Sequence, residues 1–170
     1  FTLISTCFPT HHLIFAEDAN NTLWTSSGVS GPGAVGWLNR KMFEETGDEM
    51  KSQGWTPFIL DTNGNGKRDE WVEVKETVDS AKDKRVHVSL YSVNVNPVDG
   101  TVWGTSMGFP GYVVRIAPGA DPTHTALTEI YLPPDIGYGS RGIDLDLNGV
   151  VWTVLSSGHM ASFDRRKCKG

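Results

Sequence analysis

Three stretches of the chain share one pattern of apolar and polar residues. Each stretch alternates the two kinds, passes through a polar pair and resumes with an apolar residue followed by tryptophan. Alternation with a period of two is typical of a β-strand that buries one face, and polar pairs of this kind favour hairpin turns. The pattern predicts three hairpins, each with a type I′ turn that holds both central residues at positive φ. The turn pairs are Asn20-Asn21, Asp99-Gly100 and Asn148-Gly149, and the tryptophans that follow them are Trp24, Trp103 and Trp152.

Each predicted hairpin is followed by a third apolar stretch, which begins after a glycine-containing turn. The apolar positions Leu38, Ile116 and Phe163 correspond in these three stretches. Residues 125–132 add a fourth strand of β-rich composition, which ends at Pro133-Pro134. Four antiparallel strands per unit make the blade of a β-propeller.

We therefore expect an all-β fold of about three propeller blades, at about residues 8–39, 86–132 and 138–166. Propellers close with about four to eight blades, so these three would form an incomplete ring. We expect the remaining blades to come from the same protein or from other copies of the chain. The 170 residues would then be a piece of a longer protein.

Residues 40–85 do not follow the repeated pattern and lengthen the first interval between tryptophans. Asn39 as N-cap and Gly47 just past the end predict a short helix over residues 40–46. Between Lys67 and Arg85, 12 of 19 residues are charged, with both signs mixed. Such a run is typical of a solvated surface, so we interpret the segment as an insertion that decorates the first blade.

The insertion contains a loop with the spacing of a calcium site. Oxygen-bearing side chains stand at loop positions 1, 3, 5 and 9, and Gly66 at position 6 permits a sharp turn. An EF-hand also needs Glu at position 12, where this chain has Val72, so that interpretation fails. Glu70 and Glu73 are spare carboxylates. The loop is either a Ca²⁺ site or a plain turn with solvated charges. The candidate ligands are Asp61, Asn63, Asn65 and Asp69.

A second group of candidates follows from the expected propeller. The innermost strand of each blade would open at its N-terminal end toward one face, which brings polar groups together. Those ends are His11-His12, Tyr91-Ser92 and Ser140-Arg141. The histidines can act as metal ligands or as a general base, and Arg141 can bind a carboxylate or phosphate. Alternatively, the histidines begin a strand and Arg141 pairs with a neighbouring acid.

Several other residues have both a functional and a structural interpretation. His159 follows a turn glycine, where it is either a catalyst or a surface residue. Cys7 either completes a metal site with the histidines or packs as a small buried residue. Asp144 and Asp146 share one face of a strand, and either form an acid-base pair or end a hairpin. The tryptophans of the three hairpins are expected in the core, between blades.

Composition excludes several classes of protein. Twenty acidic against 15 basic residues give a net charge of −5, which argues against a nucleic-acid-binding protein. No apolar run approaches the roughly 18 residues that span a bilayer, so we expect no membrane span, and no leader typical of a signal peptide opens the chain. Cys7 and Cys168 are too few for a disulfide scaffold. Nucleophile-elbow, Walker and dinucleotide motifs do not occur.

Residues 128–153 resemble the blade junction of streptogramin (virginiamycin B) lyase-like propellers. In that family a strand ending in Leu-Pro leads to Arg-Gly-Ile, then to Asp-x-x-Gly-x-Val-Trp. This chain has Leu132-Pro133, Arg141-Gly142-Ile143 and the segment from Asp146 to Trp152. The segment 112–116 matches the family's Ile-x-Arg-Ile strand. The superfamily also includes gluconolactonase-like and NHL-type relatives and large bacterial envelope proteins.

Together with the calcium-type loop, the resemblance implies a calcium-stabilised, exported bacterial propeller that presents a face for a small-molecule ligand or a partner, in the periplasm or secreted. The alternative is a metal-dependent lyase or lactonase, with His11, His12, Arg141 and His159 around Mg²⁺ or another divalent ion. The family's catalytic Glu has no counterpart after the hairpin tryptophans of this chain. The resemblance also implies that Cys168 forms a disulfide with a residue beyond the chain.

Overall fold

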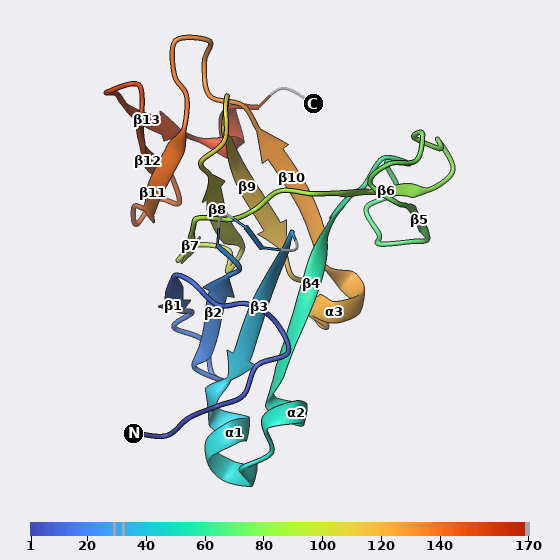
Figure 1. The fold of residues 1–170 in the computed structure, drawn as a ribbon, viewed down its shortest axis with the longest axis vertical. Coiled ribbons are helices and arrows are strands. Elements are labelled where there is room, and N and C mark those ends of the chain that lie inside the picture. Colours follow the sequence, from blue (N-terminus) through green and yellow to red (C-terminus); the bar gives the residue numbers. More distant parts are fainter. Residues whose placement is uncertain (29, 32, 169–170) are drawn as a thin grey trace.

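The computed structural model describes residues 1–28, 30–31 and 33–168, and within them the chain folds into thirteen β-strands and three short α-helices. Figure 1 shows a large twisted sheet, a small sheet beside it and a projecting arm. The large sheet contains β1 (Leu13–Phe15), β2 (Thr22–Ser26), β3 (Ala34–Asn39), β4 (Gln53–Leu60), β7 (Ser92–Val95), β8 (Val102–Ser106), β9 (Tyr112–Ala117) and β10 (Leu127–Tyr131). The arm contains β5 (Trp71–Val72) and β6 (Asp83–Val86), and the small sheet contains β11 (Ser140–Leu145), β12 (Val151–Leu155) and β13 (Met160–Phe163).

The predicted propeller is wrong. The strands of the first two expected blades form one continuous sheet in the order β1-β2-β3-β4-β10-β9-β8-β7. They are joined because β10 lies parallel to β4, with Thr128 opposite Leu60. The two ends of this path, β1 and β7, lie next to each other, so the eight strands nearly close into a mixed, barrel-like sheet. Near-closure protects edge strands without separate blades.

The three predicted hairpins are confirmed, but their turn type is wrong. The hairpins β1-β2, β7-β8 and β11-β12 are antiparallel, and each pairs its tryptophan across the ladder. Only the second residue of each turn pair has positive φ: Asn21 at 48°, Gly100 at 70° and Gly149 at 76°. A type I′ turn needs two such residues. The loops are longer than two residues, and an aspartate spans two of them: Asp18 accepts from the Thr22 amide, and Asp146 accepts from the Val150 amide.

The described helices are short: two connect β3 to β4, one connects β9 to β10, and a 3₁₀ helix follows β13. They are α1 (Arg40–Thr46), α2 (Glu49–Ser52) and α3 (Pro122–Thr125), and the 3₁₀ helix η1 covers Arg165–Lys167. The predicted α1 is confirmed, because the Asn39 side chain accepts from the Met42 amide and Gly47 ends the helix at a φ of 64°. In view of the helix lengths, none of the described helices could cross a membrane.

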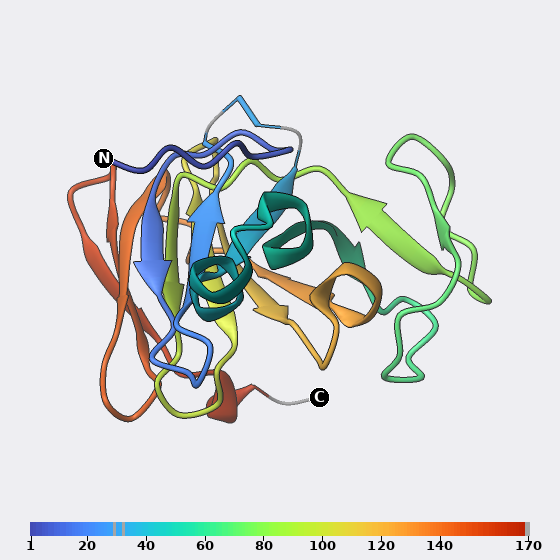
Figure 2. The same ribbon diagram turned by 90° about the horizontal axis from the view of Figure 1, so that it is seen from below.

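Strand β4 lies inside the segment that was expected to be a surface insertion. Phe58 and Ile59 of β4 are fully buried, and β4 pairs with β3, β6 and β10. A strand covered on both faces lacks the alternation that reveals a half-buried strand, so its apolar run gives only a weak signal. Figure 2 shows that the projecting part of this segment is the arm of β5 and β6.

The predicted burial of the hairpin tryptophans is confirmed for two of the three. Trp24 and Trp103 are 5% and 1% exposed, whereas Trp152 is 48% exposed, so its predicted burial is wrong. All five residues of β8 are buried, because Val102 packs into the core inside the large sheet and Trp103 packs against the small sheet on the other face. In β12 burial alternates, and Trp152 lies on the uncovered face. Trp103 and Trp152 occupy the same position in the repeated pattern, but the first is buried and the second is half exposed.

Candidate functional site

The loop between β4 and β5 folds around the carboxylate of Asp61. Its Oδ1 accepts the amides of Gly64 (2.8 Å) and Asn65 (3.2 Å), and its Oδ2 accepts the amide of Gly66 (2.8 Å). The side-chain amides of Asn63 and Asn65 both reach Oδ2 of Asp69. Hydrogen bonds therefore join the side chains of Asn63 and Asn65 to Asp69, whereas the Asp61 carboxylate is occupied by backbone amides of the same loop.

The donor set of this loop fits a hard divalent cation. Hydrogen bonds from Asn65 and then Asn63 hold the pKa of Asp69 below its usual value, so the carboxylate is ionised at neutral pH. The side-chain oxygens of Asn63 and Asn65 accept the amides of Asn65 and Lys67, so either side chain would exchange that bond for one to Ca²⁺ when it turns its oxygen toward the ion. The spare carboxylates are used elsewhere: Glu70 pairs with Lys82, and Glu73 with Arg85. A search of the described residues finds no group of three or more His, Cys, Asp or Glu that could hold a metal.

The calcium-type loop ends at a cavity of about 530 Å³. Its walls combine aromatic and cationic side chains, which come from the N-terminal segment, α2, β4, β5, β6 and α3. Trp55 and Trp71 are large aromatic residues that remain 43% and 37% exposed. The lining residues are Cys7, Phe8, Met50, Gln53, Gly54, Trp55, Pro57, Arg68, Trp71, Arg85, Thr123 and His124. We call this cavity the Trp-Arg pocket.

Trp71, Thr56 and the Pro122 carbonyl hold Arg68 in the Trp-Arg pocket. Its guanidinium carbon lies 5.0 Å from the ring centre of Trp71, and its Nη1 donates to Thr56 Oγ1 at 2.8 Å. Nε and Nη2 donate to no other group among the described residues, and no carboxylate there lies within ion-pair distance. Burial lowers the pKa of Arg68, and the nearby charge of Asp83 offsets only part of that effect.

The calcium-type loop and the Trp-Arg pocket share Arg68. Arg68 lies inside the loop and Trp71 follows shortly after its last residue, Asp69. The Asp69 amide donates to Oδ2 of the fully buried Asp83 at 2.8 Å. Trp71 of β5 also pairs in parallel register with Asp83 of β6. Contacts with Asp83 of β6 therefore hold the backbone that runs from the loop to Trp71.

The structure brings the two adjacent histidines together with Tyr91. Nδ1 of His11 lies 3.0 Å from Nδ1 of His12, and the two atoms lie 3.1 and 2.6 Å from the carbonyl oxygen of Tyr91. Ser92 donates to the carbonyl oxygen of Arg141 at 2.8 Å. The three polar strand ends expected at one face therefore lie in sequence along the edge between β1, β7 and β11.

The side chains of the other candidate catalytic residues are not drawn into this cluster. Arg141 donates from Nε to Ser156 Oγ at 3.0 Å, and His159 lies 3.0 Å from Ser157 Oγ. No hydrogen bond or ion pair among the described residues joins either side chain to His11 or His12.

Asp144 lies in β11, but Asp146 lies in the turn after that strand, so the expectation that both share one strand face is wrong. Asp144 accepts from the Asn94 side chain, and Asp146 accepts the turn amides of Asn148 and Val150. The hydrogen bond from the Val150 amide is the main reason that the pKa of Asp146 is lowered. These contacts match the hairpin-ending interpretation.

Neither cysteine is buried. Cys7 is exposed, with Sγ 3.9 Å from Sδ of Met50, so it neither packs in the core nor contacts His11 or His12. Cys168 is exposed, and the described residues contain no disulfide.

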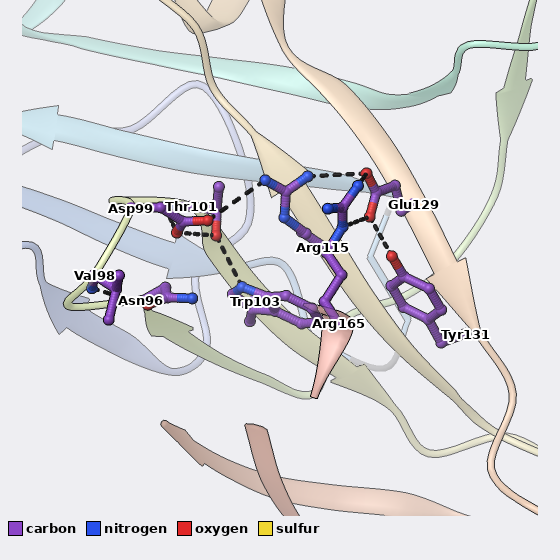
Figure 3. A network of polar contacts seen from close by, with 9 residues as sticks. All are labelled: Asn96, Val98, Asp99, Thr101, Trp103, Arg115, Glu129, Tyr131 and Arg165. Carbon is purple, nitrogen blue, oxygen red and sulfur yellow. Dashed lines mark hydrogen bonds and ion pairs between the residues drawn. The ribbon is translucent and has the colours of Figure 1, made fainter. Parts of the chain in front are cut away.

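A polar network connects the large sheet to the C-terminal turn (Figure 3). Glu129 of β10 lies at its centre and binds Arg115 (2.9 Å), Arg165 and the hydroxyl of Tyr131. Burial alone would raise the pKa of Glu129, but Arg165, Tyr131 and Arg115 together lower it. Burial and the hydrogen bond to Glu129 raise the pKa of Tyr131 to about 12. Every charge here has a partner, so we interpret this network as structural.

Comparison of the sequence with models of protein families and with curated proteins found no match. The resemblance to streptogramin lyase-like proteins therefore stays a prediction from the sequence.

The sequence analysis missed the Trp-Arg pocket. Its residues come from the segment read as a solvated insertion and from distant parts of the chain. One local signal was present, since Trp55 and Trp71 flank the calcium-type loop and Trp71 stands in an otherwise charged run. The apolar surface of a tryptophan in such a run is poorly solvated by water. Its presence there points to a ligand surface or a packing partner.

Proposed function

We propose that this chain is a calcium-stabilised ligand-binding module, whose Trp-Arg pocket takes a small organic anion with a flat apolar body. The observation that carries the proposal is the guanidinium of Arg68, which is held against Trp71 with Nε and Nη2 free of protein partners in the described residues. Nε and Nη2 are adjacent donors, and such a pair fits the two oxygens of a carboxylate. Trp55 and Trp71 offer faces for an aromatic body.

Charge supports an anionic ligand. Burial lowers the pKa of Arg68, which means that its positive charge is poorly compensated inside the protein. Arg85 lies in the same pocket but is already paired with Glu73 at 3.2 Å. An incoming carboxylate would compensate Arg68 first and leave the pair of Arg85 intact.

Calcium supports the pocket through the loop that precedes it. Two carboxylates and two amides make a weakly charged donor set, and sites of this kind in extracellular modules bind Ca²⁺ with dissociation constants of about 10⁻⁴–10⁻³ M. Such a site fills only where calcium is abundant. We therefore propose a secreted or periplasmic location, and we expect calcium to order Arg68 and Trp71 for ligand binding.

The alternative of a metal-dependent lyase or lactonase has less support, because no described contact joins Arg141 and His159 to the histidine pair.

Calorimetric titration with benzoate tests the ligand proposal, with benzyl alcohol as the uncharged analogue. Arg68→Met keeps an apolar stem but removes the donors, and Lys67→Met removes a neighbouring charge that does not line the pocket. Losing a charged hydrogen bond costs about 1.5–3 kcal/mol, so we expect about tenfold or more weaker benzoate binding in Arg68→Met and in the alcohol. Lys67→Met should bind like wild type. Equal binding of benzoate by Arg68→Met and wild type would contradict the proposal.

A further inference from the structure

The adjacent histidines lie on the same side of their strand because of an irregularity in the sheet. The His11 amide donates to the Ser26 carbonyl, and the Ser26 amide donates to the His12 carbonyl, so two residues oppose one. This is the arrangement of a β-bulge, which re-aims side chains and interrupts their alternation. In a regular strand, neighbouring side chains point to opposite faces. The bulge therefore brings the rings of His11 and His12 to a centroid distance of 4.4 Å.

The bulge is fixed on both sides. Ser26 is fully buried, and its Oγ accepts from the His12 amide at 3.1 Å and donates to the Tyr91 carbonyl at 3.1 Å. The Tyr91 amide in turn donates to Thr105 of β8 at 2.7 Å. The ring of Tyr91 packs against both histidine rings, at centroid distances of 5.3 and 4.8 Å. The cluster is therefore held by β2 and β8.

At least one of the two histidine Nδ1 atoms carries a lone pair in place of a proton. The two Nδ1 atoms are 3.0 Å apart, a hydrogen-bond distance, so one of them must lack a proton. Ser26 Oγ donates to the Tyr91 carbonyl oxygen. That oxygen has two lone pairs, so one is left for a histidine proton or a cation. Both rings are exposed, so a cation can reach the Nδ1 atoms from solvent.

We propose that His11 Nδ1, His12 Nδ1 and the carbonyl oxygen of Tyr91 bind one transition-metal ion of the Cu²⁺, Ni²⁺ or Zn²⁺ class. Two donor atoms at about 2.0–2.1 Å from one ion lie about 2.9 Å apart at a right angle and about 3.3 Å apart at the tetrahedral angle. The Nδ1 to Nδ1 distance of 3.0 Å and the His11 Nδ1 to oxygen distance of 3.1 Å fall in this range. The third edge, 2.6 Å, is slightly shorter.

The donor types select the metal class. Imidazole nitrogen suits copper, nickel and zinc, whereas calcium and magnesium prefer oxygen. This site is therefore distinct from the Asp61 loop in position and in chemistry. Three protein donors also leave coordination positions for water, as in metal sites that exchange ligands.

Copper titration in the presence of excess glycine tests the site, because glycine removes weakly held copper. The chain is used without an affinity tag. We expect one equivalent of Cu²⁺ per wild-type chain, and more than about tenfold weaker binding in His11→Gln and in His12→Gln. His159→Gln removes another exposed histidine and should leave copper binding within about twofold of wild type.

Pulsed electron paramagnetic resonance of the wild-type copper complex gives a measurement that does not depend on variant folding. Two coordinated imidazoles are expected in its spectrum. One imidazole or none, or copper affinity unchanged in His12→Gln, would overturn the proposal. A lowered melting temperature with unchanged copper stoichiometry would assign the two histidines a structural role only.

Discussion

Arg165 binds both carboxylate oxygens of Glu129, with Nε 2.5 Å from Oε2 and Nη2 2.6 Å from Oε1. The two residues come from η1 and β10, so this contact attaches the C-terminal turn to the large sheet. Arg115, which is largely buried, binds the same carboxylate. Glu129 therefore pairs with two cations, of which Arg115 also lies 3.6 Å from Asp99.

Glu129→Gln is expected to destabilise the chain by about 2 kcal/mol. The loss of one partner from a buried ion pair costs about 3–5 kcal/mol, and the partial exposure of Glu129 and Arg165 reduces that cost. Arg40→Ala removes an exposed pair with Glu44 and should cost less than about 1 kcal/mol. Urea denaturation measures both. Equal effects of the two substitutions would show that the network adds nothing to stability.

The same network predicts the acid dependence of stability. The folded-state pKa of Glu129 is lowered, so its contribution is present above the unfolded-state pKa of about 4.5 and is lost as pH falls through the folded value. Urea midpoints measured between pH 7 and pH 3 should fall on acidification in wild type. In Glu129→Gln the fall should be smaller, and parallel curves would contradict the assignment.

The pKa of Tyr131 shifts in the opposite direction, so its contribution to stability is lost at high pH instead of low pH. Its folded-state pKa is raised from 10.0 to about 12, so its contribution is present below pH 10 and is lost as pH rises toward 12. Absorbance of the phenolate near 295 nm should show one tyrosine that ionises later than the others. Tyr131→Phe should remove that late ionisation.

Trp103→Ala should cost about 3–5 kcal/mol, because the residue is fully buried and stacks near Tyr131 with ring centres 6.1 Å apart. Trp152→Ala should cost less than about 1 kcal/mol, because nearly half of its surface is exposed. Denaturant titration of both variants separates the two environments. A large loss in Trp152→Ala would place that ring in a packed contact.

Calcium is expected to raise the melting temperature of wild type, and a chelator should lower it. Asp61→Ala removes the central carboxylate of the loop and should abolish both shifts. Asp146→Ala is a matched control, since that residue also accepts turn amides but has no neighbouring ligand set. A calcium shift retained in Asp61→Ala would exclude the loop as the site.

The sequence by itself determined the local elements. The three hairpins, the helix from Arg40 to Thr46 and the turn around Asp61 all form as the pattern predicted, whereas the turn type did not follow from it. Their hydrogen bonds join residues close in the chain, such as Asn39 with Met42. Residue type and spacing suffice for such contacts. The sequence also selected His11 and His12 as candidates, and the structure places Tyr91 beside them although the propeller from which this was expected is wrong.

Only the tertiary structure decided how these elements combine. The pairing of Thr128 with Leu60 merges two expected blades into one barrel-like sheet, and the cover over β8 but not over the outer face of β12 separates Trp103 from Trp152. The Trp-Arg pocket likewise joins residues from six separate segments. Strand order, burial and pocket walls depend on contacts between residues far apart in the chain, and local periodicity carries no information about such partners.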